Sequence, residues 1–282
     1  MALKQLIAGS LVLVCILCGC GSENSSVKGY DGGSTSNVAG SADIGSAAGE
    51  QIDPPLDESI TDADQQAATE QPLSGLVICL DPGHGVTSAN RQEQVSPLSS
   101  ETKPAYVSGA AGNSQTEEEL NLAVAQLTRT ELESLGAQVV LTRETQEATV
   151  SNIERAQIAN NAQADLCIRI HADGADDPSV SGMSMQVPAG SLLGTPEIEV
   201  PSAQAAEIIL RALTEQTGAR SRGLVQRSDL TGFNWSEVPC ILLEMGFLSN
   251  AEEDAKLAEQ EYRQQIASGI VEGVCRWAEL VR

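Results

Sequence analysis

Hydrophobic residues are concentrated in short continuous runs in the second part of the chain. The three strongest runs cover residues 76–80, 166–170 and 238–243. A continuous apolar run of this length is typical of a strand that is buried on both faces of a sheet. Weaker strand patterns lie at 138–142, 182–187 and 224–226.

Between these runs, apolar residues recur at helical spacing, and polar residues mark the helix starts. Thr116 with Glu119, and Ser151 with Glu154, form capping-box patterns. The predicted helices cover residues 116–135, 151–163, 202–217, a segment after Asn250, and 262–281. Alternating strands and helices predict a single three-layer α/β domain, in which helices cover both faces of a mostly parallel or mixed central sheet.

Each of the three strong runs leads to a residue that can bind a metal or carry a proton. The first passes through Asp81 and a Pro-Gly turn to His84, the second ends at His171, and the third ends at Glu244. These are the only two histidines in the chain. Ligands of open α/β sheets bind outside the carboxyl ends of the strands. We therefore expect one metal-centred site at the C-terminal ends of the strands.

Two neutral imidazoles and a carboxylate that leave one coordination position open form a catalytic zinc site. Such an ion lowers the pKa of bound water to roughly 7, and a second carboxylate can take the proton and pass it to a leaving amine. Glu244 is a candidate for either carboxylate role. On the residues alone, the other carboxylate remains open among Glu117, Glu118, Glu119 and Asp81.

Structural roles compete with this interpretation. A histidine at a turn is commonly a hydrogen-bonded structural residue, and glutamates in the first turn of a helix are favoured by the helix dipole alone. Asp81 fits a turn residue better than a ligand. Glu244 is the stronger indication, because a carboxylate at the end of an apolar strand is desolvated unless it has a partner.

Composition divides the chain into a polar N-terminal part and a globular part. The net charge is −23, from 16 basic and 39 acidic residues, and no basic patch stands out, which argues against a nucleic-acid partner. From residue 21 to about 71 large apolar residues are almost absent, so we expect disorder there. The predicted parts are a signal peptide at 1–19, an acidic tether at 20–72 and a globular domain at 73–282. We expect the protein to be a monomer.

The first 19 residues resemble a bacterial lipoprotein signal peptide. Their apolar run at 6–17 is too short to span a bilayer comfortably, and Leu17-Cys18-Gly19-Cys20 resembles a lipobox, with Cys20 as the lipidated residue. Residues 20–72 would then be an acidic tether that reaches about 40 Å from the outer face of the membrane. A cleaved signal peptide that gives a secreted protein and an uncleaved anchor are the alternatives.

Three further features carry expectations. Cys79, Cys167 and Cys240 lie inside the strong runs, where we expect free buried thiols. Residues 86–115 are polar and predict a long functional loop without regular structure. Phe233-Asn234-Trp235 predicts an aromatic loop that either contacts substrate or packs against the domain.

Five motifs together resemble the zinc-dependent N-acetylmuramoyl-L-alanine amidases of peptidoglycan, often called the amidase 3 type. In chain order they are Leu80-Asp81-Pro82-Gly83-His84-Gly85, Glu117-Glu118-Glu119-Leu120-Asn121-Leu122, Leu141-Thr142-Arg143, Ile170-His171-Ala172-Asp173 and Glu244-Met245-Gly246-Phe247-Leu248-Ser249-Asn250. Their order and spacing are similar to the family's over residues 76–278.

The resemblance implies a function and a role for each site residue. His84, Glu117 and His171 would bind Zn²⁺, and Glu244 would be the catalytic acid/base. The reaction would hydrolyse the amide between N-acetylmuramic acid and L-alanine in peptidoglycan with zinc-activated water, in the cell wall outside the membrane. Glu117 is selected because it lies three positions before Leu120, where the family's liganding glutamate stands.

The chain departs from the family pattern near the site. Arg169 stands where a small residue is frequent, and Asp173 stands where asparagine is frequent. Arg169 lies on the same side of its strand as His171, so it either contacts substrate or forms a salt bridge. Together with Asn234 and Trp235, it completes the list of candidate substrate-binding residues.

Two other functions fit parts of this pattern. A zinc peptidase or carboxypeptidase acting on peptidoglycan would use the same metal site. A non-catalytic solute-binding lipoprotein would fit the anchor and the tether, but it gives no reason for histidines and a glutamate at three strand ends.

Overall fold

The computed structural model describes residues 71–85 and 90–282. The predicted signal peptide, Cys20 and the tether up to residue 70 lie outside the described residues. Among the helices that are described, each is too short or too polar to cross a lipid bilayer.

A six-stranded sheet forms the centre of the domain. Its strands are β1 (Val77–Pro82), β4 (Gln138–Leu141), β5 (Leu166–Asp173), β6 (Met183–Pro188), β7 (Ser221–Arg227) and β8 (Cys240–Phe247), in the order β4-β1-β5-β8-β6-β7. Neighbouring strands are parallel except for β8 and β6, which are antiparallel. The predicted mixed α/β sheet is confirmed, and the antiparallel pair places residues of β6 beside those of β8.

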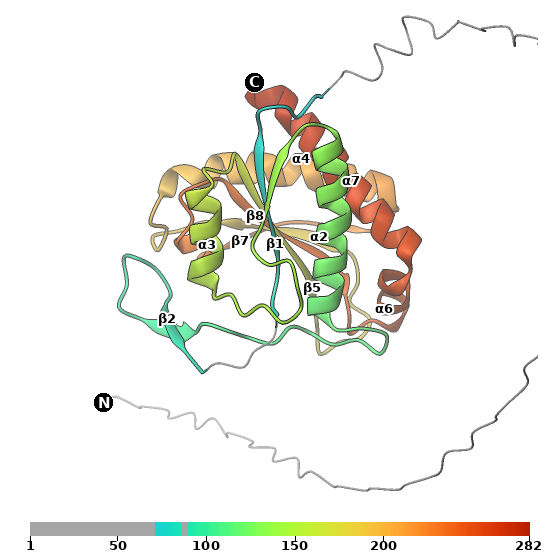
Figure 1. The fold of residues 1–282 in the computed structure, drawn as a ribbon. Helices are drawn as coiled ribbons and strands as arrows, with labels where there is room; N and C mark the ends of the chain where they lie inside the picture. Colours follow the sequence, from blue (N-terminus) through green and yellow to red (C-terminus); the bar gives the residue numbers. More distant parts are fainter. Residues whose placement is uncertain (1–70, 86–89) are drawn as a thin grey trace, which may run out of the picture. The chain divides into compact units, whose positions relative to one another are not determined.

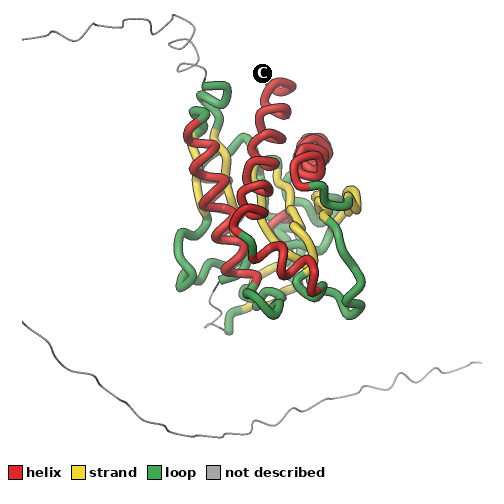
Figure 2. Tube along the Cα trace, turned by 90° about the vertical axis from the view of Figure 1, so that its right-hand side faces the viewer, coloured by secondary structure: helices red, strands yellow, loops and turns green. Residues whose placement is uncertain are grey.

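Helices cover both faces of this sheet (Figure 1). They are α2 (Glu117–Ser134), α3 (Asn152–Asn161), α4 (Glu199–Thr217), α5 (Thr231–Asn234), α6 (Ala251–Ala258) and α7 (Gln260–Val281), with a 3-10 turn η1 (Pro196–Ile198) before α4. Viewed from the side, long helices pass in front of the strands, and another helix is seen nearly end-on to their right (Figure 2). Both predicted capping boxes are present, at the starts of α2 and α3.

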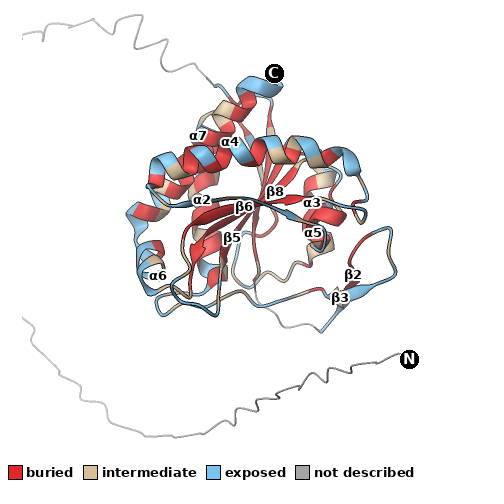
Figure 3. Ribbon diagram, turned by 180° about the vertical axis from the view of Figure 1, so that it is seen from behind, coloured by how far each residue is buried: buried red, intermediate tan, exposed pale blue. Residues whose placement is uncertain are grey.

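The two faces of the sheet carry cores of different size. Ile78, Leu80 and Ile168 belong to the larger core, which includes residues of α2, α4 and α7. Cys79, Cys167 and Cys240 point to the opposite face and pack with Ala159 of α3, Phe233 of α5 and other residues of a smaller core. In the view from behind, β5, β6 and β8 are almost entirely buried, whereas β7 at the sheet edge and the strands β2 and β3 are largely exposed (Figure 3). The smaller face leaves room for polar side chains at the C-terminal ends of its strands.

The three strand cysteines are free buried thiols, as predicted, and Cys275 of α7 is also free. Cys79 pairs in register with Cys167, which pairs in register with Cys240. The hydrogen bond with Cys167, together with burial, raises the pKa of the Cys240 thiol well above its usual value. The pKa of the Cys167 thiol is likewise raised well above its usual value, so Cys167 and Cys240 are protonated packing groups.

The prediction of a loop without regular structure at 86–115 is wrong at two short segments of its described part, most of which is otherwise irregular. Residues 92–94 and 102–104 form the antiparallel hairpin β2 (Gln92–Gln94) and β3 (Thr102–Pro104). Its strands are too short and polar to show a period-2 pattern. Tertiary contacts hold the hairpin instead, because buried Glu93 accepts hydrogen bonds from Asn152 Nδ2 (2.8 Å) and the Ile153 backbone N–H (3.1 Å) at the start of α3.

Three other boundaries also differ from the prediction. β8 does not end at Glu244 but continues to Phe247, because β5 and β6 flank it on both sides and Phe247 still pairs with Asp173. β7 extends from Ser221 to Arg227 rather than covering only 224–226. The predicted aromatic loop at 233–235 begins inside the short helix α5.

Candidate active site

The C-terminal ends of β1, β5 and β8 meet at one cavity. His171 of β5 and Glu244 of β8 are paired in the sheet register, and His84 lies in the turn that follows β1. All three line a cavity of about 360 Å³, together with residues of the β2–β3 hairpin and of α3. The predicted convergence of the strand ends is therefore present in the structure.

Glu117, at the first position of α2, connects the two histidines. Its Oε1 lies 3.1 Å from His84 Nε2 and 2.9 Å from His171 Nδ1. The centroids of the two imidazole rings are 4.8 Å apart, and the ring planes are nearly perpendicular. One ligand atom from each residue lies within 4.8 Å of the others, which fits a metal ion bound between them. Among the four carboxylates left open by the sequence, Glu117 is the one in this group.

The outer contacts of the group fix the orientation of its side chains. His84 Nδ1 lies 2.7 Å from the Val107 carbonyl oxygen, so this nitrogen is the donor and Nε2 faces Glu117. The second Glu117 oxygen, Oε2, accepts from the Ala110 backbone N–H at 2.7 Å. Histidine ligands of metals characteristically donate their other N–H in this way.

The charges of the group also suit a cation. Burial would raise the pKa of Glu117, but hydrogen bonds and charge from His171 and His84 hold it well below the usual range. Burial lowers the pKa of His171, which favours the neutral imidazole that metal binding needs. His171 Nε2 is buried without a hydrogen-bond partner among the described residues. A divalent ion would satisfy the buried carboxylate while both imidazoles stay neutral.

Two glycines allow these side chains to approach each other. A Cβ atom on Gly83 would lie 2.1 Å from His171 Cε1, and one on Gly109 would lie 2.7 Å from Glu117 Oε2. Both distances are far below van der Waals contact. Gly83 of the first motif therefore leaves space for the His171 ring, in addition to making the turn.

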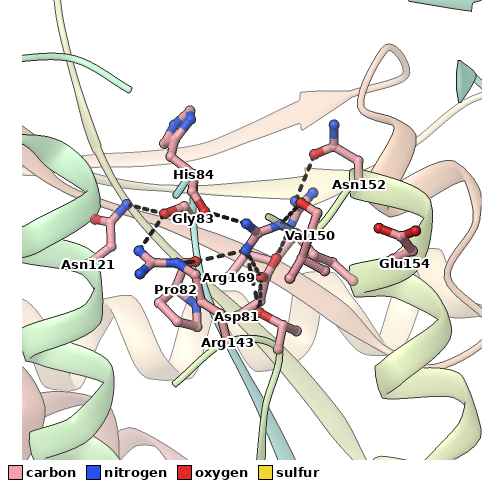
Figure 4. Close-up of polar contacts among 12 residues, drawn as sticks. Asp81, Pro82, Gly83, His84, Asn121, Arg143, Val150, Asn152, Glu154 and Arg169 are labelled. Carbon is pink, nitrogen blue, oxygen red and sulfur yellow. Dashed lines mark hydrogen bonds and ion pairs between the residues drawn. The ribbon is translucent and has the colours of Figure 1, made fainter. Parts of the chain in front are cut away.

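His84 adopts a left-handed backbone conformation with φ of 59°, which a non-glycine residue holds only when its surroundings enforce it. Two buried arginines, Arg143 and Arg155, supply that enforcement. Figure 4 labels Arg143 beside Pro82 and Gly83. Arg143 donates to the carbonyls of Pro82 (2.9 Å) and Gly83 (2.9 Å). Arg155 donates to the carbonyls of Pro82 (2.8 Å) and His84.

Asp81 is the centre of this arginine cluster, and the expectation of a turn residue is wrong. It is the fifth residue of β1, is 1% exposed, and binds Arg155 Nη1 at 2.6 Å and Arg169 Nε at 2.7 Å. Burial would raise its pKa, but the two guanidinium charges and the hydrogen bonds from Thr142 and Arg155 hold it far below the usual range. Asp81 thus carries a full negative charge that offsets part of the positive charge of Arg155 and Arg169 beneath the His84 turn.

Glu244 is buried, at 7% exposure, beside the metal-ligand candidates. Its Oε1 accepts from Gln186 Nε2 at 2.9 Å, while Oε2 has no partner among the described residues. Burial raises the pKa of Glu244 well above its usual value, and the negative charges of Asp173 and Glu117 add to the effect. A carboxylate with a raised pKa and one free oxygen is equipped to accept and return a proton.

The three candidate substrate-binding residues lie in different surroundings. Arg169 lines the cavity and forms the salt bridge with Asp81 that was its alternative role. Asn234 is fully buried, and its Nδ2 donates to the carbonyls of Val95 (2.9 Å) and Ser228 (3.2 Å). Trp235 donates through Nε1 to the Gln94 carbonyl at 3.0 Å. For Asn234 and Trp235 these contacts support the packing alternative.

Sequence reasoning did not identify several residues that shape the site. Arg155, Gln186 and Arg227 line the cavity, and Asn121 donates to the Gly83 carbonyl (3.3 Å) and to Glu117 Oε1 (3.3 Å). The sequence indicated Arg143 only as part of a motif, without a role. The contact of Asn121 with Glu117 could have been predicted, because Asn121 stands four residues after Glu117 on the same helix face.

Comparisons with known proteins agree on one family. A family model described as N-acetylmuramoyl-L-alanine amidase matches residues 78–276. The chain is 31% identical over 204 residues to N-acetylmuramoyl-L-alanine amidase LytC of Bacillus subtilis, which covers 72% of this chain and 36% of LytC. It is 29% identical over 216 residues to N-acetylmuramoyl-L-alanine amidase Rv3717 of Mycobacterium tuberculosis, which covers 74% of this chain and 88% of that protein. The chain thus spans only about a third of LytC.

Solved structures show the same fold. The crystal structure of the N-acetylmuramyl-L-alanine amidase Ami1 from Mycobacterium smegmatis superposes with a TM-score of 0.68 at 27% identity, covering 74% of this chain and 99% of that one. The apo form of Ami1 from Mycobacterium abscessus gives a TM-score of 0.67 at 26% identity, covering 73% and 99%. The described domain therefore corresponds to nearly the whole of each of these two chains.

Proposed function

The chain belongs to the family of N-acetylmuramoyl-L-alanine amidases, and from this premise we propose how its residues carry out the reaction. The protein is an amidase that hydrolyses the bond between N-acetylmuramic acid and L-alanine in peptidoglycan. The catalytic domain covers residues 73–282, and the reaction takes place at the cavity where β1, β5 and β8 end.

His84, Glu117 and His171 hold the metal ion, which we take to be zinc. The support is the donor set itself, because two imidazoles and a carboxylate are the ligands of catalytic zinc sites that leave one position open. When bound, zinc supplies Lewis-acid polarisation of a carbonyl group and makes water acidic near neutral pH. The Val107 carbonyl and the Ala110 N–H keep His84 and Glu117 turned toward this centre.

Glu244 is the general base and then the general acid. Its Oε2 is the oxygen without a hydrogen-bond partner among the described residues, so it is the atom available to take a proton from the attacking water. The same oxygen then returns that proton to the amine of the leaving L-alanine residue. Burial and neighbouring negative charge raise the pKa of Glu244 well above its usual value, which favours a group that both takes and returns a proton.

The single observation that carries this assignment is the position of Glu244. It lies in the strand next to His171, at the same register level, and lines the same cavity as both histidines. A buried carboxylate with one free oxygen, next to a metal-ligand set, has no evident structural purpose.

The test is product analysis with the full chain and two matched variants. Wild-type protein should release peptides with a free L-alanine N-terminus from purified sacculi, detected by mass spectrometry. Glu244→Gln keeps the shape and should lower the rate by roughly 10²- to 10⁴-fold. Glu207→Gln makes the same change at an exposed position of α4 and should leave the rate unchanged.

Other products would point to the other functions considered. Cleavage within the stem peptide would identify a peptidase or carboxypeptidase, and absence of any cleavage together with substoichiometric zinc would favour a solute-binding protein. Full activity of Glu244→Gln would remove Glu244 from the mechanism.

We further propose that the protein is a lipoprotein anchored at the outer face of the cytoplasmic membrane. The support is the apolar run at 6–17 followed by the lipobox-like Leu17-Cys18-Gly19-Cys20, and the mostly polar 52-residue segment between Cys20 and Leu73, which contains 10 acidic residues. A lipid on Cys20 would hold the domain near the membrane, and the segment 21–72 would let it reach the wall.

A further inference from the structure

The two carboxylate oxygens of Glu244 have different surroundings. Oε1 accepts a hydrogen bond from Gln186 Nε2 at 2.9 Å, and Oε2 is buried without a partner among the described residues. Gln186 lies on β6, the antiparallel neighbour of β8, and is paired in the register with Leu242. One neutral side chain therefore determines which Glu244 oxygen is tied to the protein.

The Gln186 amide can make this contact in only one orientation. Its Oε1 accepts from Arg227 Nη1 at 2.8 Å, and a guanidinium can only donate. The carbonyl side of the amide must therefore face Arg227, which turns the NH₂ side toward Glu244. A flipped amide would set two donors against each other at Arg227.

Arg227 is itself held in place. Its Nε and Nη2 donate to Asp229 Oδ1 and Oδ2, each at 2.8 Å, in a two-point contact that fixes the plane of the guanidinium. The backbone carbonyl of Asp229 also accepts from Lys103 of the β2–β3 hairpin at 2.9 Å. The contacts form a continuous chain from Asp229 through Arg227 and Gln186 to Glu244.

We propose that Gln186 and Arg227 are positioning residues for Glu244. They hold Glu244 Oε1 against β6 so that Oε2 alone is presented to the cavity, and Arg227 acts only through the orientation of Gln186. This inference rests on the proposed function, because it assigns the proton transfer to Glu244.

A competing role is direct contact with substrate, since Gln186 and Arg227 both line the cavity. The two roles differ in their kinetic effects. Loss of a positioning contact lowers kcat and leaves KM near its wild-type value, whereas loss of a uniform substrate contact raises KM and leaves kcat unchanged.

The experiment measures kcat and KM of the full chain on a soluble muropeptide for Gln186→Leu, Arg227→Met and the double variant. Each single change should lower kcat roughly 10- to 100-fold. The double variant should be no slower than Gln186→Leu, because both residues act through one contact. Gln226→Leu is the matched control, since Gln226 is exposed on β7 next to Arg227.

Four further readouts separate positioning from loss of structure. Melting temperature and zinc content should stay near wild type in all variants, Arg227→Lys should recover part of the activity, and Gln186→Leu should have no effect in the Glu244→Gln background. Should Gln186→Leu fail to fold, Arg227→Met at its partly exposed position still decides the matter.

Failure of the inference is distinct from failure of the proposed function. Wild-type kcat in Gln186→Leu or Arg227→Met, additive losses in the double variant, or a raised KM at constant kcat would overturn the positioning role while the amidase assignment stands. A wild-type chain that releases no peptides with a free L-alanine N-terminus would overturn the function itself.

Discussion

At the scale of single residues, the site depends on side chains held in positions that cost free energy. His84 has a positive φ, and Glu244 is a carboxylate buried beside two other negative charges. Such strain persists only where the surroundings over-determine the conformation. Here the two arginines at the His84 turn and Gln186 at Glu244 supply that constraint. The residues proposed to carry the reaction are therefore also residues whose conformation or buried charge costs free energy.

Asp173 provides a test of the electrostatics at Glu244. Burial and then the charge of Asp173 raise the pKa of Glu244, so Asp173→Asn should lower that pKa. A general base must be ionised, so the acid-side midpoint of kcat/KM against pH should move to lower pH in this variant. The measurement is a pH profile of both enzymes, with exposed Asp176→Asn as the control. An unchanged or higher midpoint would contradict this account.

At the scale of elements, the order of the strands creates the site. β5 lies between β1 and β8, so the turn after β1 and the end of β8 both reach His171. Two of these strands, β1 and β5, carry Asp81 and Arg169 further down the sheet, where Asp81 is in register with Arg169. This ion cluster supports the turn from beneath and joins α3 to the sheet through Arg155.

Replacement of Asp81 by Asn should destabilise the domain strongly. The buried guanidinium groups of Arg155 and Arg169 would lose their counter-charge, which costs about 3–5 kcal/mol when one partner of a buried pair is removed. Urea unfolding at neutral pH measures the loss, with Asp176→Asn as the control. A difference below about 1 kcal/mol would show that the arginines find other partners.

The pH dependence of this loss has a defined sign. The pKa of Asp81 in the folded protein lies below its ordinary value of 3.8, so its contribution is fully present above that value. It is lost as the pH falls toward the folded-state pKa, where the wild type binds a proton. The difference between wild type and Asp81→Asn should therefore shrink in strong acid.

Sequence patterns predict part of this arrangement and miss another part for identifiable reasons. The apolar runs and capping boxes are local signals, so the α/β fold and the strand ends at His84 and His171 could be predicted. Glu117 required the motif resemblance, because three adjacent glutamates look alike in a helix start. Gln186 gave no signal at all, because its role arises from the antiparallel pairing of β6 with β8, which no local pattern encodes.

At the scale of the whole molecule, the lipid anchor is a prediction that lies outside the described residues. Cys20→Ser removes the thiol that would be lipidated. In a bacterial host that processes lipoproteins, wild-type protein should fractionate with the membrane, and the variant should lose lipid labelling and leave the membrane fraction if its signal peptide is cut nearby. Cys275→Ser in α7 is the matched control and should remain with the membrane. Equal lipid labelling of Cys20→Ser and wild type would contradict lipidation at Cys20.

Metal binding should also stabilise the domain as a whole, because its ligands join three separate elements. His84 follows β1, Glu117 begins α2 and His171 lies on β5, so an ion between them would restrain the sheet and α2 together. An ion at a free concentration 100 times its dissociation constant adds about 2.7 kcal/mol to the free energy of unfolding. For a domain of this size, that corresponds to a rise in melting temperature of roughly 5–10 °C. Thermal denaturation of chelator-treated protein with and without added zinc measures the effect independently of activity.

Glu117→Ala should abolish the zinc-dependent rise, whereas Glu207→Ala on the outer face of α4 should retain it. An equal rise in Glu117→Ala would place the stabilising ion elsewhere, and no rise in the wild type would contradict a zinc site at these three residues.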